Sequence, residues 1–201
     1  IYEKGFSKGR KLTAGITHQQ SYTNNTYLGT LENQTRMNQA YSGAYAQFRG
    51  KLGKYSYMVG MSALRVWLKQ GGEDVETWRF SPRFSLSRTF NKQWSASLNG
   101  NMGTSNPSLS QLSAVDQLTD SLQIKRGNPD LIPYYIYNGS FRLNYNKGKV
   151  NVGFYTNYSH RDNPIMTHVY RENNKFVHSY ANHDKFQKLS MGLNVRIGML
   201  W

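Results

Sequence analysis

The chain has 201 residues, with 25 Lys and Arg against 11 Asp and Glu, a formal net charge of +14 and a mean hydropathy of −0.69. Cys is absent, which excludes disulfides, thiolate zinc sites and Cys nucleophiles. No run approaches the about 20 apolar residues that a membrane-spanning helix needs, whereas a spanning β-strand needs apolar side chains on one face only. The composition therefore excludes a helical membrane protein and leaves open a β-sheet protein, soluble or membrane-embedded.

Eight segments alternate apolar and polar side chains with a period of two, which predicts β-strands that have one apolar and one polar face. In the last of them every odd position from Leu189 to Trp201 is apolar. The segments are about 9 to 13 residues long, the length that a tilted strand needs to cross a bilayer and more than is usual in soluble sheets. They lie at residues 11–22, 38–50, 55–68, 77–90, 94–102, 137–145, 150–159 and 189–201.

The connections between these segments alternate between short and long. Short basic turns lie at residues 51–54, 91–93 and 146–149, and long connections lie at about 23–35, 70–77, 103–133 and 162–185. Ten of the 11 acidic residues fall in or beside the long connections, whereas Lys marks the short turns. Outer-membrane barrels have short periplasmic turns and long extracellular loops. The predicted fold is therefore all-β, an antiparallel up-and-down transmembrane β-barrel.

Two local features are superimposed on this pattern. Pro82 lies inside the fourth segment, where its missing N–H deletes a ladder hydrogen bond, so a β-bulge is predicted there. In the longest connection, apolar residues recur at roughly helical spacing over residues 113–122, which predicts a short helix.

The sequence contains no constellation that indicates catalysis. No nucleophile elbow, P-loop or dinucleotide fingerprint is present, so neither enzymatic activity nor a cofactor is expected. Four His residues lie near the last long connection, namely His160, His168, His178 and His183. They do not share tight ligand spacing, so no metal site is predicted and solvated loop or lumen positions are the preferred interpretation. The basic balance does not combine one basic face with interleaved aromatics, so no nucleic acid partner is expected.

The longest connection ends in Gly127-Asn128-Pro129-Asp130-Leu131-Ile132-Pro133 and leads directly into a long alternating segment. A run of the form Gly-Asn-Pro-x-Leu-x-Pro in this place resembles a signature of TonB-dependent outer-membrane receptors. The wider stretch 122–134 and the run Trp78-Arg79-Phe80-Ser81-Pro82-Arg83 resemble the Bacteroidetes branch of these barrels. The likeness in pattern extends over about residues 36–198. The motif residues that it identifies, as a structural loop, are Gly127, Asn128, Pro129, Leu131 and Pro133.

The resemblance implies a large barrel, plugged in its lumen, that imports a nutrient across the outer membrane of a Gram-negative bacterium with energy passed on by TonB. Plugged transporters have about 22 strands, so the eight segments are expected to be part of a larger barrel. Residues 1–201 would then belong to one transmembrane barrel domain, with a long surface loop at 103–133 and without the plug domain. The implied partners are outer-membrane lipid, TonB, the plug domain, a small solute and a surface lipoprotein.

The polar face of such a barrel would turn Arg79, Arg83, Arg142 and Arg196 toward the lumen. They would contact plug carboxylates or an anionic solute, or they would be solvated and paired with neighbouring strands, as lumen faces are polar in general. Two other functions fit the pattern. One is a small closed eight-stranded outer-membrane barrel that acts as an adhesin or structural protein. The other is a soluble β-sandwich that binds glycans, since periodicity does not tell which face is wet.

Overall fold

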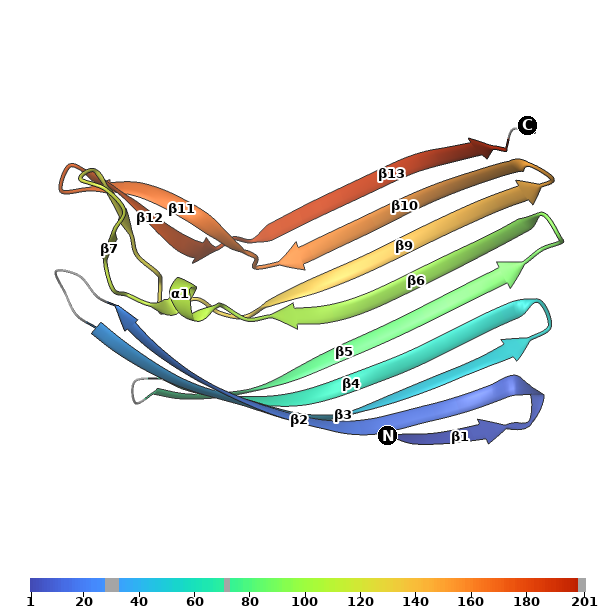
Figure 1. Cartoon of the computed structure of the whole chain (residues 1–201), viewed down its shortest axis with the longest axis horizontal. Helices are drawn as coiled ribbons and strands as arrows, with labels where there is room; N and C mark the ends of the chain where they lie inside the picture. The colour runs from blue at the N-terminus through green and yellow to red at the C-terminus, as the bar shows by residue number, and fades with distance from the viewer. Residues whose placement is uncertain (28–32, 71–72, 199–201) are drawn as a thin grey trace.

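A computed structural model describes residues 1–27, 33–70 and 73–198. Nine strands form one sheet, in the order β1-β2-β3-β4-β5-β6-β9-β10-β13, and every neighbouring pair is antiparallel. The strands lie side by side in a single layer, with β1 and β13 at opposite edges (Figure 1). They are β1 (Tyr2–Phe6), β2 (Arg10–Tyr27), β3 (Asn33–Leu52), β4 (Tyr55–Gln70), β5 (Glu73–Thr89), β6 (Trp94–Ser105), β9 (Tyr134–Lys147), β10 (Val150–Asp162) and β13 (Lys185–Ile197).

A second, smaller sheet lies at the end of the first sheet that is opposite the short turns (Figure 1). Its strand order is β11-β12-β8-β7, and β8 runs parallel to β12. Its strands are β7 (Gln117–Leu118), β8 (Gln123–Lys125), β11 (Ile165–Glu172) and β12 (Lys175–Asn182). The chain also forms a short α1 (Leu109–Leu112) and a 3-10 turn η1 (Ser7–Gly9). The connections between β6 and β9 and between β10 and β13 therefore fold together into one unit.

The register of the large sheet places apolar residues opposite apolar or small residues on one face. One such row crosses six strands through Val59, Phe84, Gly100, Gly139, Tyr158 and Leu189. Apolar side chains of this face are exposed, and Leu193 and Ile197 each keep 68% of their surface. Among the described residues, the only buried hydrophobic ones are Val66, Leu131 and Val177. A soluble sandwich would bury its apolar faces between two layers, so this single layer speaks against the β-sandwich alternative.

All eight predicted segments are strands, and the prediction of an all-β, antiparallel fold is confirmed. The prediction of about eight strands was low by one for the large sheet, because the short β1 pairs with β2 from Tyr2↔Ala14 to Phe6↔Arg10. Residues 199–201 of the eighth segment lie outside the described residues. The sheet is open among the described strands and does not close into a barrel.

Two predicted long connections are largely strand, so these predictions were wrong. The β2–β3 register continues to Tyr27↔Asn33, and the β4–β5 register continues to Gln70↔Glu73. Backbone pairing of a hairpin does not require apolar side chains, so polar strands extend past the apolar band without a period-two signal. The connection at 162–185 likewise contains the hairpin β11–β12.

The two local predictions were also wrong. The β4–β5 register runs without interruption through Met61↔Pro82, so no bulge forms. Pairing of β5 with β6 begins only at Arg83↔Asn101, so Pro82 is paired with β4 alone and its missing N–H is tolerated. The helix predicted at residues 113–122 is absent, and the described helix α1 precedes it. The pairing Leu118↔Ile124 uses these apolar residues in the β7–β8 hairpin. No helix in the described part of the chain is long and apolar enough to span a membrane.

Candidate functional site

The second face of the large sheet is polar, and its side chains also follow the register. One row across five strands consists of Ser85, Asn99, Ser140, Asn157 and Ser190. Ser85 Oγ donates to Asn99 Oδ1 at 2.6 Å, and Asn99 Nδ2 donates to Ser140 Oγ at 3.4 Å. Period-two alternation puts these small polar residues on one face, and neutral amides and hydroxyls then satisfy one another across strands.

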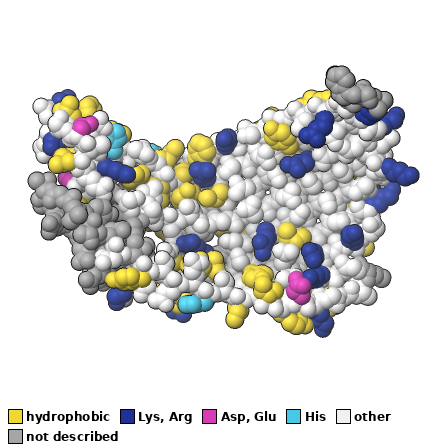
Figure 2. Space-filling view, in the orientation of Figure 1, with side chains coloured by type: hydrophobic (Ala, Val, Ile, Leu, Met, Phe, Trp, Pro, Cys, Tyr) yellow, Lys and Arg dark blue, Asp and Glu magenta, His cyan; other side chains and the backbone are white. Residues whose placement is uncertain are grey.

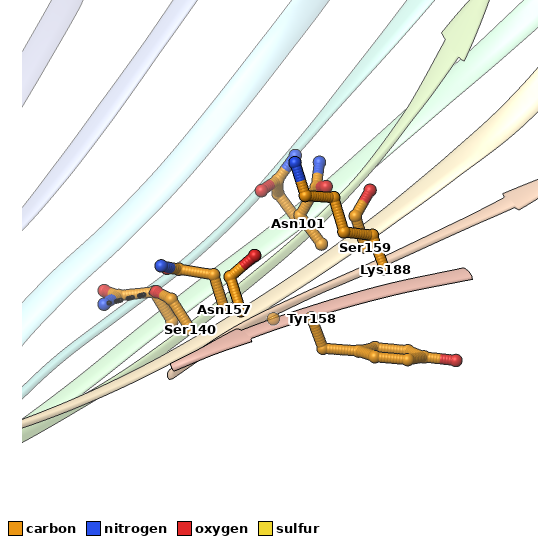
Figure 3. Close-up of a pocket in the computed structure, with 10 residues that line it drawn as sticks. Asn101, Ser140, Asn157, Tyr158, Ser159 and Lys188 are labelled. Carbon is orange, nitrogen blue, oxygen red and sulfur yellow. Dashed lines mark hydrogen bonds between the residues drawn. The ribbon is translucent and has the colours of Figure 1, made fainter. Parts of the chain in front are cut away.

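A hollow of about 450 Å³ lies on this polar face over β6, β9, β10 and β13. Asn101, Asn157, Ser159 and Lys188 point to the same side of the sheet, whereas the ring of Tyr158 points to the opposite side (Figure 3). The hollow offers amide and hydroxyl groups and one ammonium group, which can hold a polar solute or a polar protein surface. It is lined by Asn99, Asn101, Asn138, Gly139, Ser140, Asn157, Tyr158, Ser159, Lys188 and Ser190.

The four Arg residues that were predicted to face the lumen all occupy positions on the polar face of the sheet. They are spread along this face and do not form one cluster. Arg83 is paired with Asn101 at the hollow, and Arg142 lies one row toward the short turns, opposite Ser97. Arg196 is opposite Asn151 near the short turns. Arg79 is half-buried, and its Nε and Nη2 have no hydrogen-bond partner among the described residues.

The polar face has a positive balance. The sequence has no acidic residue between Glu76 and Asp116, between Asp130 and Asp162, or after Asp184. None of the four Arg residues forms an ion pair with a described carboxylate. The interpretation that neighbouring strands neutralise these Arg residues therefore finds no support in residues 1–27, 33–70 and 73–198.

The Gly-Asn-Pro motif ties three parts of the chain together. Gly127 N donates to Ser113 O at 2.8 Å, and Asn128 N donates to Gln111 O at 2.6 Å. A Cβ on Gly127 would lie 2.5 Å from Ser113 O, so the close backbone approach requires Gly. The Asn128 side chain donates to Tyr180 O at 3.0 Å and accepts from Asp130 N at 3.0 Å. The motif thus holds the segment around α1 and strand β12 against the start of β9.

The remaining motif residues have different environments. Leu131 is buried, whereas Pro129 and Pro133 are exposed at the surface of the loop. Asn182, which sequence reasoning missed, continues the motif's contacts: its Oδ1 accepts from Ile132 N at 3.0 Å, and its Nδ2 donates to Ile132 O at 3.0 Å. The same Nδ2 donates to Asn163 O at 2.7 Å. The placement of Asn182 at the end of β12 gave no sequence signal, because its partner is 50 residues away in the chain.

Arg126, immediately before the motif, is a second residue that sequence reasoning missed. Its guanidinium binds Asp116 through two N–H groups and donates to Glu172 Oε2 at 2.9 Å. It also donates to the Tyr170 hydroxyl at 3.3 Å. One side chain therefore connects the segment before β7 with β11. The sequence feature that could have identified Arg126 is its place beside Gly127 in a connection that contains several carboxylates.

The Arg126–Asp116 pair makes the loop sensitive to acid. Hydrogen bonds from Arg126 hold the pKa of Asp116 below its ordinary value of 3.8. A carboxyl group with a lowered pKa in the folded state stabilises that state above its unfolded pKa, and this contribution is lost as the pH falls through the folded pKa. We expect amide hydrogen exchange at residues 123–126 to be unchanged from pH 7 to about pH 5 after correction for intrinsic rates, and to accelerate below about pH 4. An Asp116→Asn variant should lack this acid-dependent step.

The four His residues do not form a site in the described part of the chain. His160 contacts the ring of Tyr137, with 5.8 Å between ring centroids, and His168 contacts Tyr170 at 5.7 Å. No three His, Asp or Glu side chains among the described residues come together as a metal-binding group.

Comparison with known proteins identifies the family. A family model described as the outer membrane protein beta-barrel family matches residues 2–200. The chain belongs to this family. The protein is therefore located in the outer membrane. The exposed apolar face of this barrel segment faces lipid, and the polar face is directed toward the lumen. The resemblance to outer-membrane receptor barrels is confirmed for family and fold, while the Bacteroidetes branch stays a prediction. No curated protein matches the chain.

Solved structures share the fold of this barrel segment. The FrpB iron transporter from Neisseria meningitidis (F3-3 variant) matches 98% of the chain and 32% of its own length, with 14% identity and a TM-score of 0.63. The copper transporter OprC matches 95% of the chain and 34% of its own length, with 10% identity and a TM-score of 0.72. The Serratia marcescens hemophore receptor HasR, in complex with HasA and heme, matches 92% and 40%, with 10% identity and a TM-score of 0.59. The chain thus spans about a third of the length of the first of these structures.

Proposed function

We propose that this chain forms part of the wall of a large, plugged outer-membrane barrel that imports a nutrient with energy passed on by TonB. One observation carries the proposal: nine neighbouring strands form one sheet, a polar row crosses β5, β6, β9, β10 and β13, and β1 and β13 still lie at opposite edges. An eight-stranded barrel would have closed and filled its interior with side chains. An open wall of nine strands supports a wider barrel, and it disfavours the small closed adhesin barrel.

In this proposal the two ends of the strands, at the long connections and at the short turns, have different functions. The second sheet and the Gly-Asn-Pro loop stand at the extracellular end, where solute would first make contact. The arrangement supports such a role because Asn128 and Arg126 join the two longest connections by hydrogen bonds, and Gly127 bonds to Ser113 within the first of them. A loop that is already held in place by internal hydrogen bonds loses little conformational entropy on binding. The surface lipoprotein partner implied by the resemblance would meet the protein at this end.

The wall's polar face would surround the plug and the path of the solute. Arg83 and Arg142, which form no ion pair with a described carboxylate, lie on this face next to neutral amide and hydroxyl groups. A guanidinium without a carboxylate partner of its own is available to a carboxylate of the plug or to an anionic solute. The proposal therefore assigns Arg83 and Arg142 to such contacts, with Arg79 and Arg196 farther along the same face.

Uptake by the full-length protein in its native outer membrane tests the proposal. FrpB is an iron transporter, OprC is a copper transporter and HasR is a hemophore receptor that is in complex with heme, so iron, copper and heme are the first solutes to test. We expect uptake of one nutrient to require both TonB and the proton motive force. Uptake that persists without TonB would overturn the proposal and indicate a passive pore.

A double variant, Arg83→Gln with Arg142→Gln, tests the polar face. Hydrogen bonds to charged groups contribute about 1.5 to 3 kcal/mol each, so we expect at least about a tenfold fall in uptake rate at low solute concentration. Arg65→Gln is the matched control, because Arg65 lies on the lipid-facing side and is already paired with Glu76. Equal uptake by all three proteins, at equal amounts in the membrane, would remove Arg83 and Arg142 from the mechanism.

A further inference from the structure

A cationic side chain stands on the lipid-facing surface at the short-turn end of β5. Arg88 follows Phe84 and Leu86 on the apolar face and is opposite Tyr55 and Ala96 in the register. Its Cζ lies 4.7 Å from the ring centroid of Tyr55 and 4.8 Å from that of Phe90. Stacking on two aromatic rings positions the planar guanidinium and leaves its N–H groups to donate at the edges.

A second cation, Lys54, lies in the turn before β4, next in the chain to Tyr55. Lys54 Nζ donates to Phe90 O at 3.0 Å, and Thr89 N donates to Lys54 O at 3.1 Å. These bonds attach the turn before β4 to the end of β5, so the positions of Lys54 and Arg88 are coupled. Both side chains are exposed. Aromatic rings such as those of Tyr55 and Phe90, next to exposed cations, are typical of the level at which a barrel surface meets lipid headgroups.

Within the described residues, no carboxylate serves as a counter-charge for this pair. No described carboxylate lies within ion-pair distance of Arg88 or Lys54. The sequence has no acidic residue from 33 to 72 or from 77 to 115, so none flanks either cation in β3, β4, β5 or β6. Lys and Arg side chains gather over the short-turn end of the molecule, and acidic side chains are sparse there (Figure 2).

Arg65 is a comparable Arg at the opposite end of the lipid-facing surface, and it is paired with a carboxylate. It lies on the same face of β4, and its Cζ is 4.7 Å from the ring centroid of Trp67. Its Nε and Nη2 donate to Glu76 at 2.6 and 2.7 Å. Two Arg residues on adjacent strands thus share the lipid-facing side and the aromatic stacking, but of the two only Arg65 pairs with a described carboxylate.

We propose that Arg88 and Lys54 bind the phosphate of an anionic phospholipid headgroup in the membrane leaflet on the short-turn side. The acyl chains would lie along the apolar band of β4, β5 and β6, and the phosphate would accept hydrogen bonds from the guanidinium edge and the ammonium group. The inference depends on the membrane placement of the sheet and not on transport through TonB, so the two proposals fail separately.

Native mass spectrometry of the full-length protein in neutral detergent tests the site. Phosphatidylglycerol, phosphatidylcholine and inorganic phosphate are titrated against the wild type and against Arg88→Gln, Arg88→Gln with Lys54→Gln, and Arg65→Gln. A basic residue near a membrane surface contributes about 1 kcal/mol of attraction to anionic lipid. We therefore expect phosphatidylglycerol affinity to fall about fivefold in the single variant and about 25-fold in the double variant. Arg65→Gln should bind like the wild type.

Three results would overturn the inference. One is equal affinity for phosphatidylglycerol and phosphatidylcholine in the wild type. Another is an equal loss of affinity in Arg65→Gln, which would mean a nonspecific effect of the lipid-facing charge. The third is displacement of lipid by inorganic phosphate alone, which would identify a free-anion site. An Arg88→Lys variant, which keeps the charge and most of the packing, should retain more than half of the phosphatidylglycerol binding even if Arg88→Gln assembles poorly.

Discussion

Arginine in place of Leu98 is expected to lower the free energy of unfolding of the membrane-embedded barrel by about 2 to 4 kcal/mol. Leu98 lies on the lipid-facing side of β6, midway between the Trp94↔Tyr145 and Met102↔Tyr137 pairs. This position is near the middle of the apolar band, where a guanidinium is farthest from both aqueous rims and its cost is greatest. The side chain keeps 43% of its surface exposed, so the new group would meet lipid directly.

Asn99→Arg is the matched control, since Asn99 is the next residue of the same strand and faces the lumen. The substitution removes its hydrogen bonds with Ser85 and Ser140, which costs about 1 kcal/mol or less for each bond, and the new charge stays in water. Urea unfolding in vesicles and heat-modifiable gel migration measure both variants. A larger loss in Asn99→Arg than in Leu98→Arg would mean that the two faces have been assigned the wrong way round.

The second large effect is expected from Gly127→Ala. A Cβ at this position would come within 2.5 Å of Ser113 O and 2.6 Å of Gln111 O, and both are backbone atoms that no rotamer change can move. Relief of the contact separates the segments and breaks the hydrogen bonds to Ser113 and Gln111. Each lost bond costs about 0.5 to 1.5 kcal/mol, and more where a buried group is left without a partner. We expect local opening of the connection to become easier by about 2 to 4 kcal/mol.

Amide hydrogen exchange measures this effect within residues 106–133 and in β12. The expected increase in exchange at Asn128 and Val177 is about 30-fold or more, with little change in β9 and β10, which pair through their own ladder. Gly103→Ala is the control, because a Cβ there meets nothing within 4 Å. Unchanged protection in Gly127→Ala would show that the motif does not hold the connection together.

The two long connections show where sequence reasoning succeeded and where it could not. The Gly-Asn-Pro run was recognisable because its turn residues are adjacent in the chain. Its partners were not, because Tyr180 O and Asn182 are about 50 residues away and nothing local marks them. The predicted helix at residues 113–122 failed for the same reason. Asp116 is bound by Arg126, and Leu118 is paired with Ile124, so tertiary contacts overrode an apparent helical period.

The sequence by itself determined the strands and the two faces of the large sheet. A period of two is a local property, and it alone assigns Leu98 to one face and Asn99 to the other. It also determined the contrast between short basic turns and acidic long connections, because charge and length are read directly from the chain.

Only the tertiary structure decided what surrounds each charged side chain. Arg65 and Arg88 look alike in sequence as basic residues near the ends of alternating segments. Cross-strand register gives Arg65 the carboxylate of Glu76, whereas Arg88 has two aromatic rings and no counter-ion among the described residues. The pairing of strands fixes these distances, and a one-residue shift in register would exchange the faces. For that reason the ion pairs, the hydrogen bonds between the two long connections and the environment of Arg88 can be identified only in the assembled sheet.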